Sequence, residues 1–384
     1  MKHIVIVGKY YPPEFGGVER YTRDVARVAA KAHRVTVVVH NRGREDLVEQ
    51  HENITVVRCG TVTTISSQPV SLSMLARLRS LQPDLVHFNA PNFWGAGMLS
   101  LAGYTAPLII THHADVFGRP LLKRAVMPIY HHLVRRATCV VVSSLKNATA
   151  SKDLPMKAGK FIEIPWAVDE TQYYLNESER ASVLAERRER FGDVPIIGFI
   201  GRFVRYKALP VFVDALSRLD DVHALLIGDG PLREQIEELV RVAGISERVH
   251  FLGNLDEASK IRALAMMDIL TLPSNDTTEA FGLVQVEAQL MGLPVVASRL
   301  LTGVTDVTLD EITGLLVPPD DPNALAAAFA RLLSDRESAR RFGVAGRERA
   351  LRLFKMVAFE DRFSRLFNAV LMGQPFDELM MPFL

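Results

Sequence analysis

Two glutamates, Glu279 and Glu287, flank a short segment whose backbone is suited to holding an anion. They stand eight residues apart, about 2.2 turns of an α-helix, so we expect both carboxylates on roughly one helix face. Gly282 lies between them, and the free amides of a first helical turn attract anions. Carboxylates accept hydrogen bonds from sugar hydroxyls. The segment therefore fits a phosphate flanked by two polyols, which is the chemistry of a nucleotide sugar.

Positive charge that could balance such a phosphate follows an apolar strand segment. Ile196–Gly201 (IIGFIG) leads into Arg202 and Lys207, which stand five residues apart at an expected helix start. Arginine offers a planar fork and lysine a point charge, a combination suited to a diphosphate. Taken alone, the two cations could equally be solvated residues at the start of a helix.

A glycine pair follows the first apolar run of the chain. Gly16 and Gly17 open a helical pattern, where glycine lets backbone amides approach an anion. Lys9, earlier in the same loop, could add charge to this site. The loop lacks the GxGxxG spacing of a dinucleotide site, and a plain tight turn is the alternative.

Strand and helix patterns alternate along the whole chain, and they must position these loops. Continuous β-branched runs are typical of strands buried on both faces of a parallel sheet. The expected strands are His3–Gly8, Arg34–His40, Ile54–Cys59, Asp84–Asn89, Leu108–His112, Cys139–Ser143 and Phe161–Pro165, then Ile196–Gly201, Ala224–Gly228, Val249–Leu252, Ile269–Leu272, Val295–Ser298 and Leu315–Val317.

The restart of this pattern predicts an α/β chain with two doubly wound domains. A polar, Glu/Arg-rich connecting helix within 169–191 separates them. We place the domains at 1–168 and 169–355, with a C-terminal helix and tail at 356–384 that packs back on the first domain. Because such domains bind ligands at the carboxyl ends of their strands, we expect two facing domains with the active site in the cleft between them.

The overall charge is close to neutral but unevenly distributed. The chain has 45 Lys and Arg against 44 Asp and Glu, a net charge of +1, which argues against a nucleic-acid-binding protein. Residues 1–168 carry 21 Lys and Arg against 11 Asp and Glu, a balance of +10, and residues 169–384 carry −9. The basic half predicts a face that meets an anionic partner.

Several features predict a cytoplasmic protein. Cys59 and Cys139 lie in apolar runs, as buried and unreactive thiols do, and form neither a disulfide framework nor a metal-binding spacing. The N-terminus lacks a small-residue cleavage site. Phe93–Ile110 is uncharged and about long enough to span a membrane, but it divides naturally into a helix (Asn92–Tyr104) and a strand (Pro107–His113).

In this order, the motifs resemble those of the family 4 retaining glycosyltransferases of the GT-B fold. The resemblance covers nearly the whole chain. The matching positions are Gly16-Gly17 with Glu19, Gly201-Arg202 through Lys207, Gly228-Asp229-Gly230-Pro231, Glu279 with Glu287, and Gly314–Val317.

The resemblance implies transfer of a hexose, with retention, from a nucleotide sugar to a glycan or polyprenyl-linked acceptor. The first domain would bind the acceptor and the second the donor. Arg202 and Lys207 would hold the donor diphosphate, Glu279 the transferred sugar and Glu287 the ribose hydroxyls. The other implied donor-binding positions are Gly16, Gly17, Phe281, Gly282, Leu283, Val284 and Gly253, the last within an expected base pocket at Phe251–Asn254.

The segment Thr111-His112-His113-Ala114-Asp115 matches the histidine-bearing loop of that family. The resemblance implies a catalytic role for His113, which we favour over His112, and places Asp115 and Glu19 on the acceptor side. A purely structural role for histidines at a strand end is the alternative.

The sequence departs from the family pattern in two places. Ala208 stands where a glycine is usual after the lysine, and 302–306 (TGVTD) replaces a Gly-Gly loop that ends in glutamate. The second departure bears on sugar identity. We find no Asp-x-Asp metal motif after a strand, and Asp320-Asp321-Pro322 is typical of a helix cap. We therefore expect neither a metal nor a cofactor, with the nucleotide sugar as a substrate.

The acceptor and donor are predicted less sharply. Gly118–Ala137 has an amphipathic pattern interrupted at Pro128, with cations including Lys123, and predicts either a core-packed helix or docking on an anionic cytoplasmic membrane surface. The resemblance favours bacterial mannosyl- and rhamnosyltransferases of polysaccharide assembly, with GDP-mannose as the first donor and a UDP-hexose as the alternative. Nothing in the sequence selects an oligomeric state.

Two further function classes are compatible with paired α/β domains. One is a nucleotide-dependent oxidoreductase, against which the missing GxGxxG counts. The other is a non-catalytic protein that binds sugar nucleotides. The presence of both Arg202 and Glu279 counts against that class.

Overall fold

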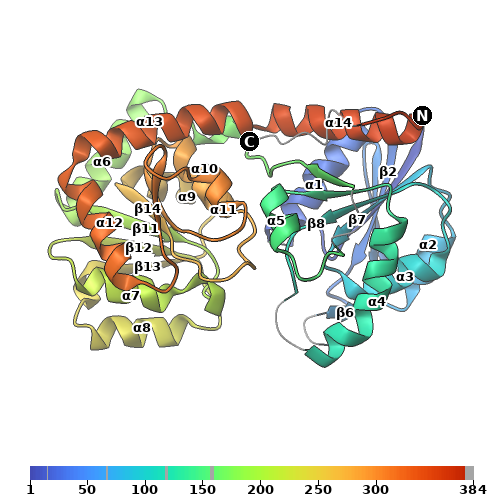
Figure 1. Ribbon diagram of the computed structural model, residues 1–384, viewed down its shortest axis with the longest axis horizontal. Coiled ribbons are helices and arrows are strands. Elements are labelled where there is room, and N and C mark those ends of the chain that lie inside the picture. Colours follow the sequence, from blue (N-terminus) through green and yellow to red (C-terminus); the bar gives the residue numbers. More distant parts are fainter. Residues whose placement is uncertain (15, 66–67, 117–119, 156–159, 377–384) are drawn as a thin grey trace. The chain divides into compact units, whose positions relative to one another are not determined.

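The computed structural model describes residues 1–14, 16–65, 68–116, 120–155 and 160–376, which fold into two compact α/β units (Figure 1). The first unit contains Met1–Trp166 and the C-terminal segment from Val357 onward, and the second contains Ala167–Met356. Each unit is built around its own largely parallel sheet. The predicted pair of doubly wound α/β units is confirmed.

Within the described residues, the first unit has an eight-stranded sheet in the order β10-β9-β8-β7-β1-β2-β4-β3. Its neighbouring strands pair in parallel, except that β3 runs antiparallel to β4. The strands are β1 (His3–Val7), β2 (Arg34–His40), β3 (Leu47–His51), β4 (Ile54–Cys59), β7 (Leu85–Ala90), β8 (Leu108–His112), β9 (Cys139–Val142) and β10 (Phe161–Glu163), with a separate hairpin of β5 (Thr63–Ile65) and β6 (Gln68–Val70).

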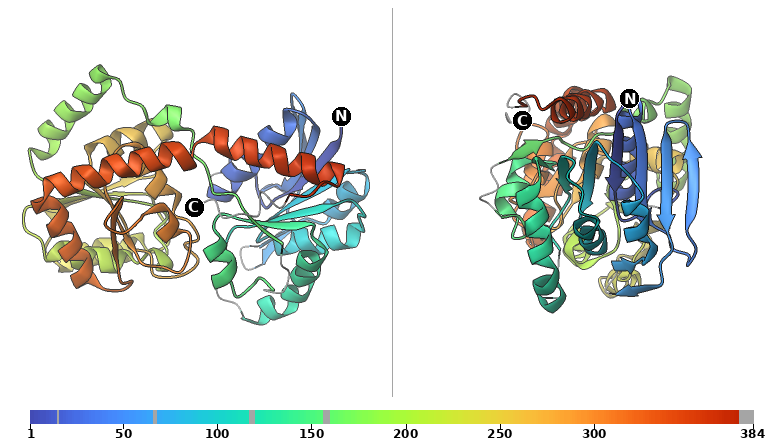
Figure 2. Two further views of the ribbon diagram at one scale, coloured as in Figure 1. Left: turned by 45° about the horizontal axis from the view of Figure 1, so that its top comes forward. Right: turned by 90° about the vertical axis from the view of Figure 1, so that its right-hand side faces the viewer.

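Helices cover both faces of this sheet. They are α1 (Gly17–Ala30), α2 (Ser73–Arg79), α3 (Phe93–Ala102), α4 (Pro120–Arg136), α5 (Leu145–Ala150) and α14 (Met356–Met372). Side chains alternate along β7, so Val86 and Phe88 join a core with α2, α3 and α4. His87, on the opposite face, contacts Phe363 and Phe367 of α14, the long C-terminal helix seen from two sides in Figure 2.

The second unit has a six-stranded parallel sheet in the order β13-β12-β11-β14-β15-β16. The strands are β11 (Ile196–Ile200), β12 (His223–Ile227), β13 (Val249–Gly253), β14 (Ile269–Leu272), β15 (Val295–Ser298) and β16 (Gly314–Val317). The helices are α6 (Glu177–Phe191), α7 (Leu209–Ser217), α8 (Arg233–Val242), α9 (Glu257–Met266), α10 (Leu283–Leu290), α11 (Val304–Val307), α12 (Pro322–Ser334) and α13 (Arg336–Leu353).

The core of the second unit lies between the sheet and the helices α7, α8 and α12. Phe199 of β11, Phe212 of α7 and Phe329 of α12 are fully buried there. The helix α10 packs against β14 and β15, and contributes nothing to this cluster. The predicted connecting helix is present as α6, where Asn176 and Glu179 form a capping box.

The strands predicted from apolar runs are all present, but the edge strand β3 and the hairpin strands β5 and β6 were missed. The missed strand β3 (LVEQH) is mostly exposed, so it carries no run of buried residues that a sequence pattern could reveal. The cap at Asp320-Asp321-Pro322 is confirmed, because the Asp321 side chain accepts from the Ala324 amide and Pro322 opens α12.

The uncharged stretch 93–110 forms α3 and the start of β8, as predicted from its composition. Among the residues that the structure describes, no helix is both long and apolar enough to cross a membrane. Cys59 and Cys139 are free and buried, and burial raises the pKa of each thiol to about 12, which keeps both unreactive.

Among the buried histidines of the first unit, three have strongly lowered pKa values. His40 and His87 are 1% and 0% exposed, and burial lowers their pKa values to about 4 and about 3. His113 is 4% exposed, and burial, assisted by His112 and His87, lowers its pKa well below 6.5. All three rings are therefore neutral in the native state at pH 7.

We expect the stability of the protein to fall steadily as the pH drops below about 6.5. Unfolding exposes these rings, so the unfolded state binds more protons than the native state, and stability is lost from the unfolded pKa down towards the native one. At pH 5, His40 and His87 each cost about 2 kcal/mol. Urea titrations at pH 7.5 and pH 5 measure the loss.

His87→Gln removes one titrating ring and should reduce the pH dependence of the unfolding free energy. His132→Gln changes an exposed ring on α4 and serves as the matched control. An unchanged pH dependence in His87→Gln would contradict the assignment.

Candidate functional site

The predicted residues of the second unit come from loops at one edge of its sheet. Arg202 and Lys207 follow β11, Gly253 ends β13, and Glu279 follows β14. Because these strands are parallel, their carboxyl ends share an edge, and the loops gather there.

Lys207 and Glu279 form the central contact of this edge. Lys207 Nζ makes an ion pair with Glu279 Oε2, and the two residues are 8% and 7% exposed. Ser274 Oγ donates to the same carboxylate oxygen at 2.7 Å, and Thr302 Oγ1 donates to the Glu279 carbonyl at 2.8 Å. Burial acts to lower the pKa of Lys207, but the Glu279 carboxylate and Tyr206 together outweigh burial and raise it. Lys207 is therefore held charged in a fixed place.

The expectation that Glu279 and Glu287 share one helix face is wrong. The helix α10 begins only at Leu283, so Glu279 lies in the loop before it. Glu287 lies within α10 and accepts from Lys260 Nζ at 2.9 Å. The two glutamates are thus paired with different lysines. Lys260, which also pairs with Glu257, is a residue of this site that the sequence motifs did not reveal.

The start of α10 is shaped by Gly282, whose φ is +69°. A Cβ there would lie 2.5 Å from Leu272 Cδ2 and 2.7 Å from Gln285 Nε2, so both the dihedral angle and the packing require glycine. Gln285 is fully buried and donates to the Phe281 carbonyl at 2.9 Å. The amides of Leu283 and Val284 belong to the first turn of α10, whose N–H groups have no partner within the helix.

Arg202 differs from Lys207, because it is exposed and forms no ion pair with any residue in the described part of the chain. The backbone beside it is fixed by a tight approach of two loops. Phe203 N donates to the Asp229 carbonyl at 2.9 Å, and a Cβ on Gly228 would lie 2.1 Å from the Gly201 carbonyl oxygen. The Gly228-Asp229-Gly230 turn therefore fixes the backbone that carries Arg202.

Gly253 is the last residue of β13 at this edge and has a φ of +66°. Its carbonyl accepts a hydrogen bond from Gly228 N at 2.7 Å. In the expected base pocket, the Arg233 guanidinium lies 5.3 Å from the centre of the Phe251 ring. Phe281 is buried against Phe354, at 5.6 Å between ring centres, and so serves packing.

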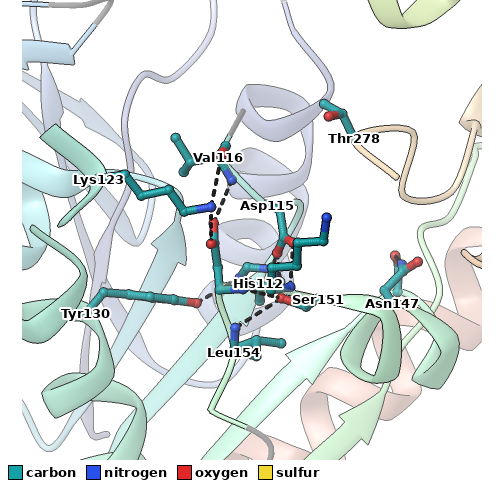
Figure 3. Close-up of polar contacts among 12 residues, drawn as sticks. His112, Asp115, Val116, Lys123, Tyr130, Asn147, Ser151, Leu154 and Thr278 are labelled. Atoms are coloured by element: carbon teal, nitrogen blue, oxygen red, sulfur yellow. Dashed lines mark hydrogen bonds and ion pairs between the residues drawn. The ribbon is translucent and has the colours of Figure 1, made fainter. Parts of the chain in front are cut away.

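In the first unit, Asp115 pairs with His112 (Figure 3). His112 Nε2 lies 3.1 Å from Asp115 Oδ1, and its Nδ1 lies 2.8 Å from the Tyr130 hydroxyl. Ser151 Oγ and the Lys152 amide also donate to Asp115. Burial acts to raise the pKa of Asp115, but these hydrogen bonds outweigh it and hold the pKa at about 2.

His113 lies in a different environment from its neighbour. Its Nε2 is 3.1 Å from Asn89 Oδ1, and its ring meets Tyr21 and Trp166 edge-on at 4.6 Å and 5.4 Å. Its Nδ1 is buried and has no hydrogen-bond partner within the described residues. His113 therefore offers a neutral imidazole, and it is not linked to Asp115.

The glycine pair of the first unit lies at the start of α1. Gly17 packs under Trp166, because a Cβ there would lie 2.7 Å from Trp166 Cζ3. A Cβ on Gly16 would meet the Glu19 carboxylate at 2.0 Å. Burial raises the pKa of Glu19, although its own backbone amide and Lys9 act against the rise.

Ala208, the first departure from the family pattern, has a φ of +49° between Lys207 and α7. This left-handed conformation strains a residue with a Cβ, which is the physical reason for a glycine at this position. The second departure contributes Thr302, whose hydroxyl holds the Glu279 carbonyl.

We expect Ala208→Gly to raise the free energy of unfolding by about 1 kcal/mol, because glycine removes the left-handed strain. Chemical denaturation measures the change. Ala215→Gly, in the right-handed helix α7, should instead lower stability by about 1 kcal/mol. If Ala208→Gly lowered the free energy of unfolding as Ala215→Gly does, backbone strain at Ala208 would be refuted.

Comparison with known proteins places this geometry in a family. Residues 15–172 match the model described as Glycosyltransferase Family 4, and residues 184–349 match the model described as Glycosyl transferases group 1. Between them the two models match well over half of the chain.

Two curated relatives span almost the same length. O-antigen chain mannosyltransferase C of Escherichia coli is 25% identical over 375 residues, covering 97% of this chain and 99% of the relative. GDP-mannose-dependent alpha-(1-6)-phosphatidylinositol monomannoside mannosyltransferase of Mycobacterium tuberculosis is 27% identical over 372 residues, covering 91% and 93%.

Among solved structures, a sucrose-phosphate synthase from Thermosynechococcus elongatus superposes with a TM-score of 0.82 at 24% identity, covering 97% of this chain and all of that one. This likeness shows the fold. With the strand–loop–helix sites and the two family matches, it follows that the chain is a glycosyltransferase of glycan synthesis that belongs to the family 4 glycosyltransferases of the GT-B fold.

Proposed function

We propose that this glycosyltransferase moves a hexose, with retention, from a nucleotide sugar to a glycan or lipid-linked acceptor in cell-surface polysaccharide synthesis. The observation that carries the proposal is the buried Lys207–Glu279 pair beside the first turn of α10. This arrangement puts a fixed cation, a carboxylate and free backbone amides at one edge of the sheet. A sugar diphosphate needs all three kinds of group.

The charge of the donor diphosphate would be met by two different cations. Arg202 is exposed and can turn its planar guanidinium onto phosphate oxygens. Lys207 is held in place by Glu279, so it keeps its charge and position while charge develops on the leaving nucleoside diphosphate. With the amides of Leu283 and Val284, they form a preorganised electrostatic site, which stabilises that developing charge.

Glu279 has a second role in the proposal. Its Oε2 receives Lys207 and Ser274, whereas its Oε1 has no partner within the described residues. That oxygen can accept a hydrogen bond from a hydroxyl of the transferred sugar. Glu287, held by Lys260, would accept from the ribose in the same way. In this proposal Glu279 accepts from hydroxyls of the transferred sugar and Glu287 from hydroxyls of the ribose, so neither carboxylate is assigned as a covalent nucleophile. Front-face attack with retention is the proposed path.

In this proposal the protein's own cations and amides balance the diphosphate, so the reaction needs neither a metal nor a cofactor. GDP-mannose is the proposed donor, because a relative matching over most of its length is named as GDP-mannose-dependent. His113 would accept a hydrogen bond at Nδ1 from an acceptor or sugar hydroxyl after a local opening of its buried ring. Glu19 and Asp115 remain proposed acceptor-side residues.

We expect Arg202→Ala to lose at least 100-fold in kcat/KM for sugar release from GDP-mannose, because it removes a phosphate contact strongest in the transition state. Arg205→Ala is the matched control, also exposed and without an ion pair among the described residues. Glu279→Gln should be equally impaired. It is preferred to Glu279→Ala, which leaves Lys207 buried without a hydrogen-bonded partner.

The same assay decides the donor and the need for metal. GDP- and UDP-sugars are compared with and without EDTA, and nuclear magnetic resonance reads the anomeric configuration of the product. Retained activity in EDTA and an unchanged anomer support the proposal. Near-normal turnover by Arg202→Ala would overturn the role of Arg202. Faster turnover of a UDP-hexose would overturn GDP-mannose as the donor, and inversion at the anomeric carbon would overturn the retaining path.

We also propose that the basic first unit docks on an anionic membrane surface, where a lipid-linked acceptor would lie. Part of the predicted basic helix serves the fold instead, because Lys123 pairs with Asp153 and Arg136 donates to the Ala106 carbonyl. Arg124 and Arg135 of α4 are exposed and form no ion pair among the described residues. Arg119, another cation of the predicted basic helix, lies outside the described residues.

We expect Arg124→Glu/Arg135→Glu to weaken sedimentation with anionic liposomes, since each basic residue near the surface contributes about 1 kcal/mol. The matched control is Arg347→Glu/Arg352→Glu, which makes the same charge change on α13 of the second unit. Binding that is independent of anionic lipid and of salt would refute the docking.

A further inference from the structure

A cavity lies in the second unit, at the edge of the sheet opposite the site described above. It has a volume of about 530 Å³, which is within the range of small-molecule sites. Pro195, Asp268 and Pro294 line it, and they directly precede β11, β14 and β15. These three strands are neighbours, so the cavity lies under their amino ends.

The floor of the cavity is apolar. Met267, Ile269, Leu293 and Leu332 line it, and each is less than a tenth exposed. The apolar part of a ligand could lie on this floor and be removed from water.

The walls carry four arginines from the helices α6 and α13. These two helices lie on one side of the unit (Figure 1). Arg187 and Arg188 belong to α6, and Arg336 and Arg340 belong to the first two turns of α13. Arg336 and Arg340 stand four residues apart on α13, so their side chains are neighbours on one helix face. Two neighbouring guanidinium groups can both donate hydrogen bonds to one phosphate.

Only part of this charge is neutralised inside the protein. Arg187 donates to Asp268 at 2.6 Å, and the same Asp268 oxygen accepts from the Ile196 amide, so this pair serves the fold. Arg188 lies 3.5 Å from Asp193, with side chains 78% and 90% exposed, and such a pair contributes little.

Arg336 and Arg340 form no ion pair or hydrogen bond through their side chains with any described residue. Two unpaired arginines above an apolar floor form a cationic pocket in the half of the chain whose overall balance is −9. The cavity is thus lined by positive charge, although the half of the chain that contains it has a net negative charge.

We propose that this cavity is a second binding site, for a small organic phosphate whose phosphate lies between Arg336 and Arg340 and whose apolar body lies on the floor. The site is separate from the proposed donor site. The strands between them are five and four residues long for β11 and β14, so the two edges are about 15 Å apart.

Phenyl phosphate is the probe, because it joins a phosphate to an apolar ring, and isothermal titration calorimetry measures its binding. We expect at least tenfold weaker binding by Arg336→Ala/Arg340→Ala than by the wild type. Arg347→Ala/Arg352→Ala, which removes two exposed arginines from the same helix away from the cavity, should bind within twofold of the wild type. Inorganic phosphate should bind the wild type more weakly than phenyl phosphate, because it leaves the floor uncovered.

The double variants separate this site from the donor site, since neither pair of substitutions touches the loops around Lys207. Equal affinity in all three proteins, or no binding to the wild type, would overturn the proposal. Inorganic phosphate binding as tightly as phenyl phosphate would overturn the role of the floor.

Flotation with phosphatidylcholine vesicles containing phosphatidic acid identifies the source of the phosphate. Vesicle binding that is weaker in Arg336→Ala/Arg340→Ala than in both the wild type and Arg347→Ala/Arg352→Ala assigns a lipid phosphate. Loss of phenyl phosphate binding in Arg336→Ala/Arg340→Ala with unchanged vesicle binding assigns a free organic phosphate.

Discussion

The ion pair between Lys207 and Glu279 joins two loops that are 72 residues apart in the sequence. Both side chains are almost fully buried, so removing either partner leaves an uncompensated charge, a change that typically destabilises a protein by about 3–5 kcal/mol. Ser274 and Thr302 add hydrogen bonds to the side chain and backbone of the same glutamate. These contacts fix three segments relative to one another: the loop after β11, the loop after β14 and the segment before α11. In the proposed function, this fixed arrangement supplies the charged groups that bind the nucleotide sugar.

In the first unit, too, buried polar side chains fix a loop at the end of a strand, here through a histidine and an aspartate. His112 and Asp115 form a satisfied network with Tyr130 and Ser151, and this network fixes the loop after β8. His113, the next residue, is left with a buried Nδ1 that has no partner in the described structure. Two adjacent histidines thus divide into one that holds the loop and one whose ring keeps a nitrogen without a partner among the described residues. Their opposite directions follow from the alternation of side chains at the end of a strand.

The second sheet concentrates chemistry at both of its ends. At the carboxyl ends, loops and the start of α10 gather cations, carboxylates and amides. At the amino ends, α6 and α13 place arginines over an apolar floor. An acidic domain that keeps unpaired arginines at two separate places has two places suited to an anion. Short parallel strands keep these places apart while tying both to the same hydrogen-bonded framework.

The sequence by itself determined the α/β class, the order of the strands along the chain and the loops that follow them, because buried parallel strands need continuous apolar runs. It also determined which residue types could meet a diphosphate. Only the tertiary structure decided the partners: Lys207 with Glu279, Lys260 with Glu287, and Asp115 with His112 in place of His113. Helical arithmetic failed at Glu279 because α10 begins four residues later. The exposed strand β3 and the arginine-lined cavity were also hidden, since periodicity is local, whereas pairing and cavities depend on which distant segments the sheet brings together.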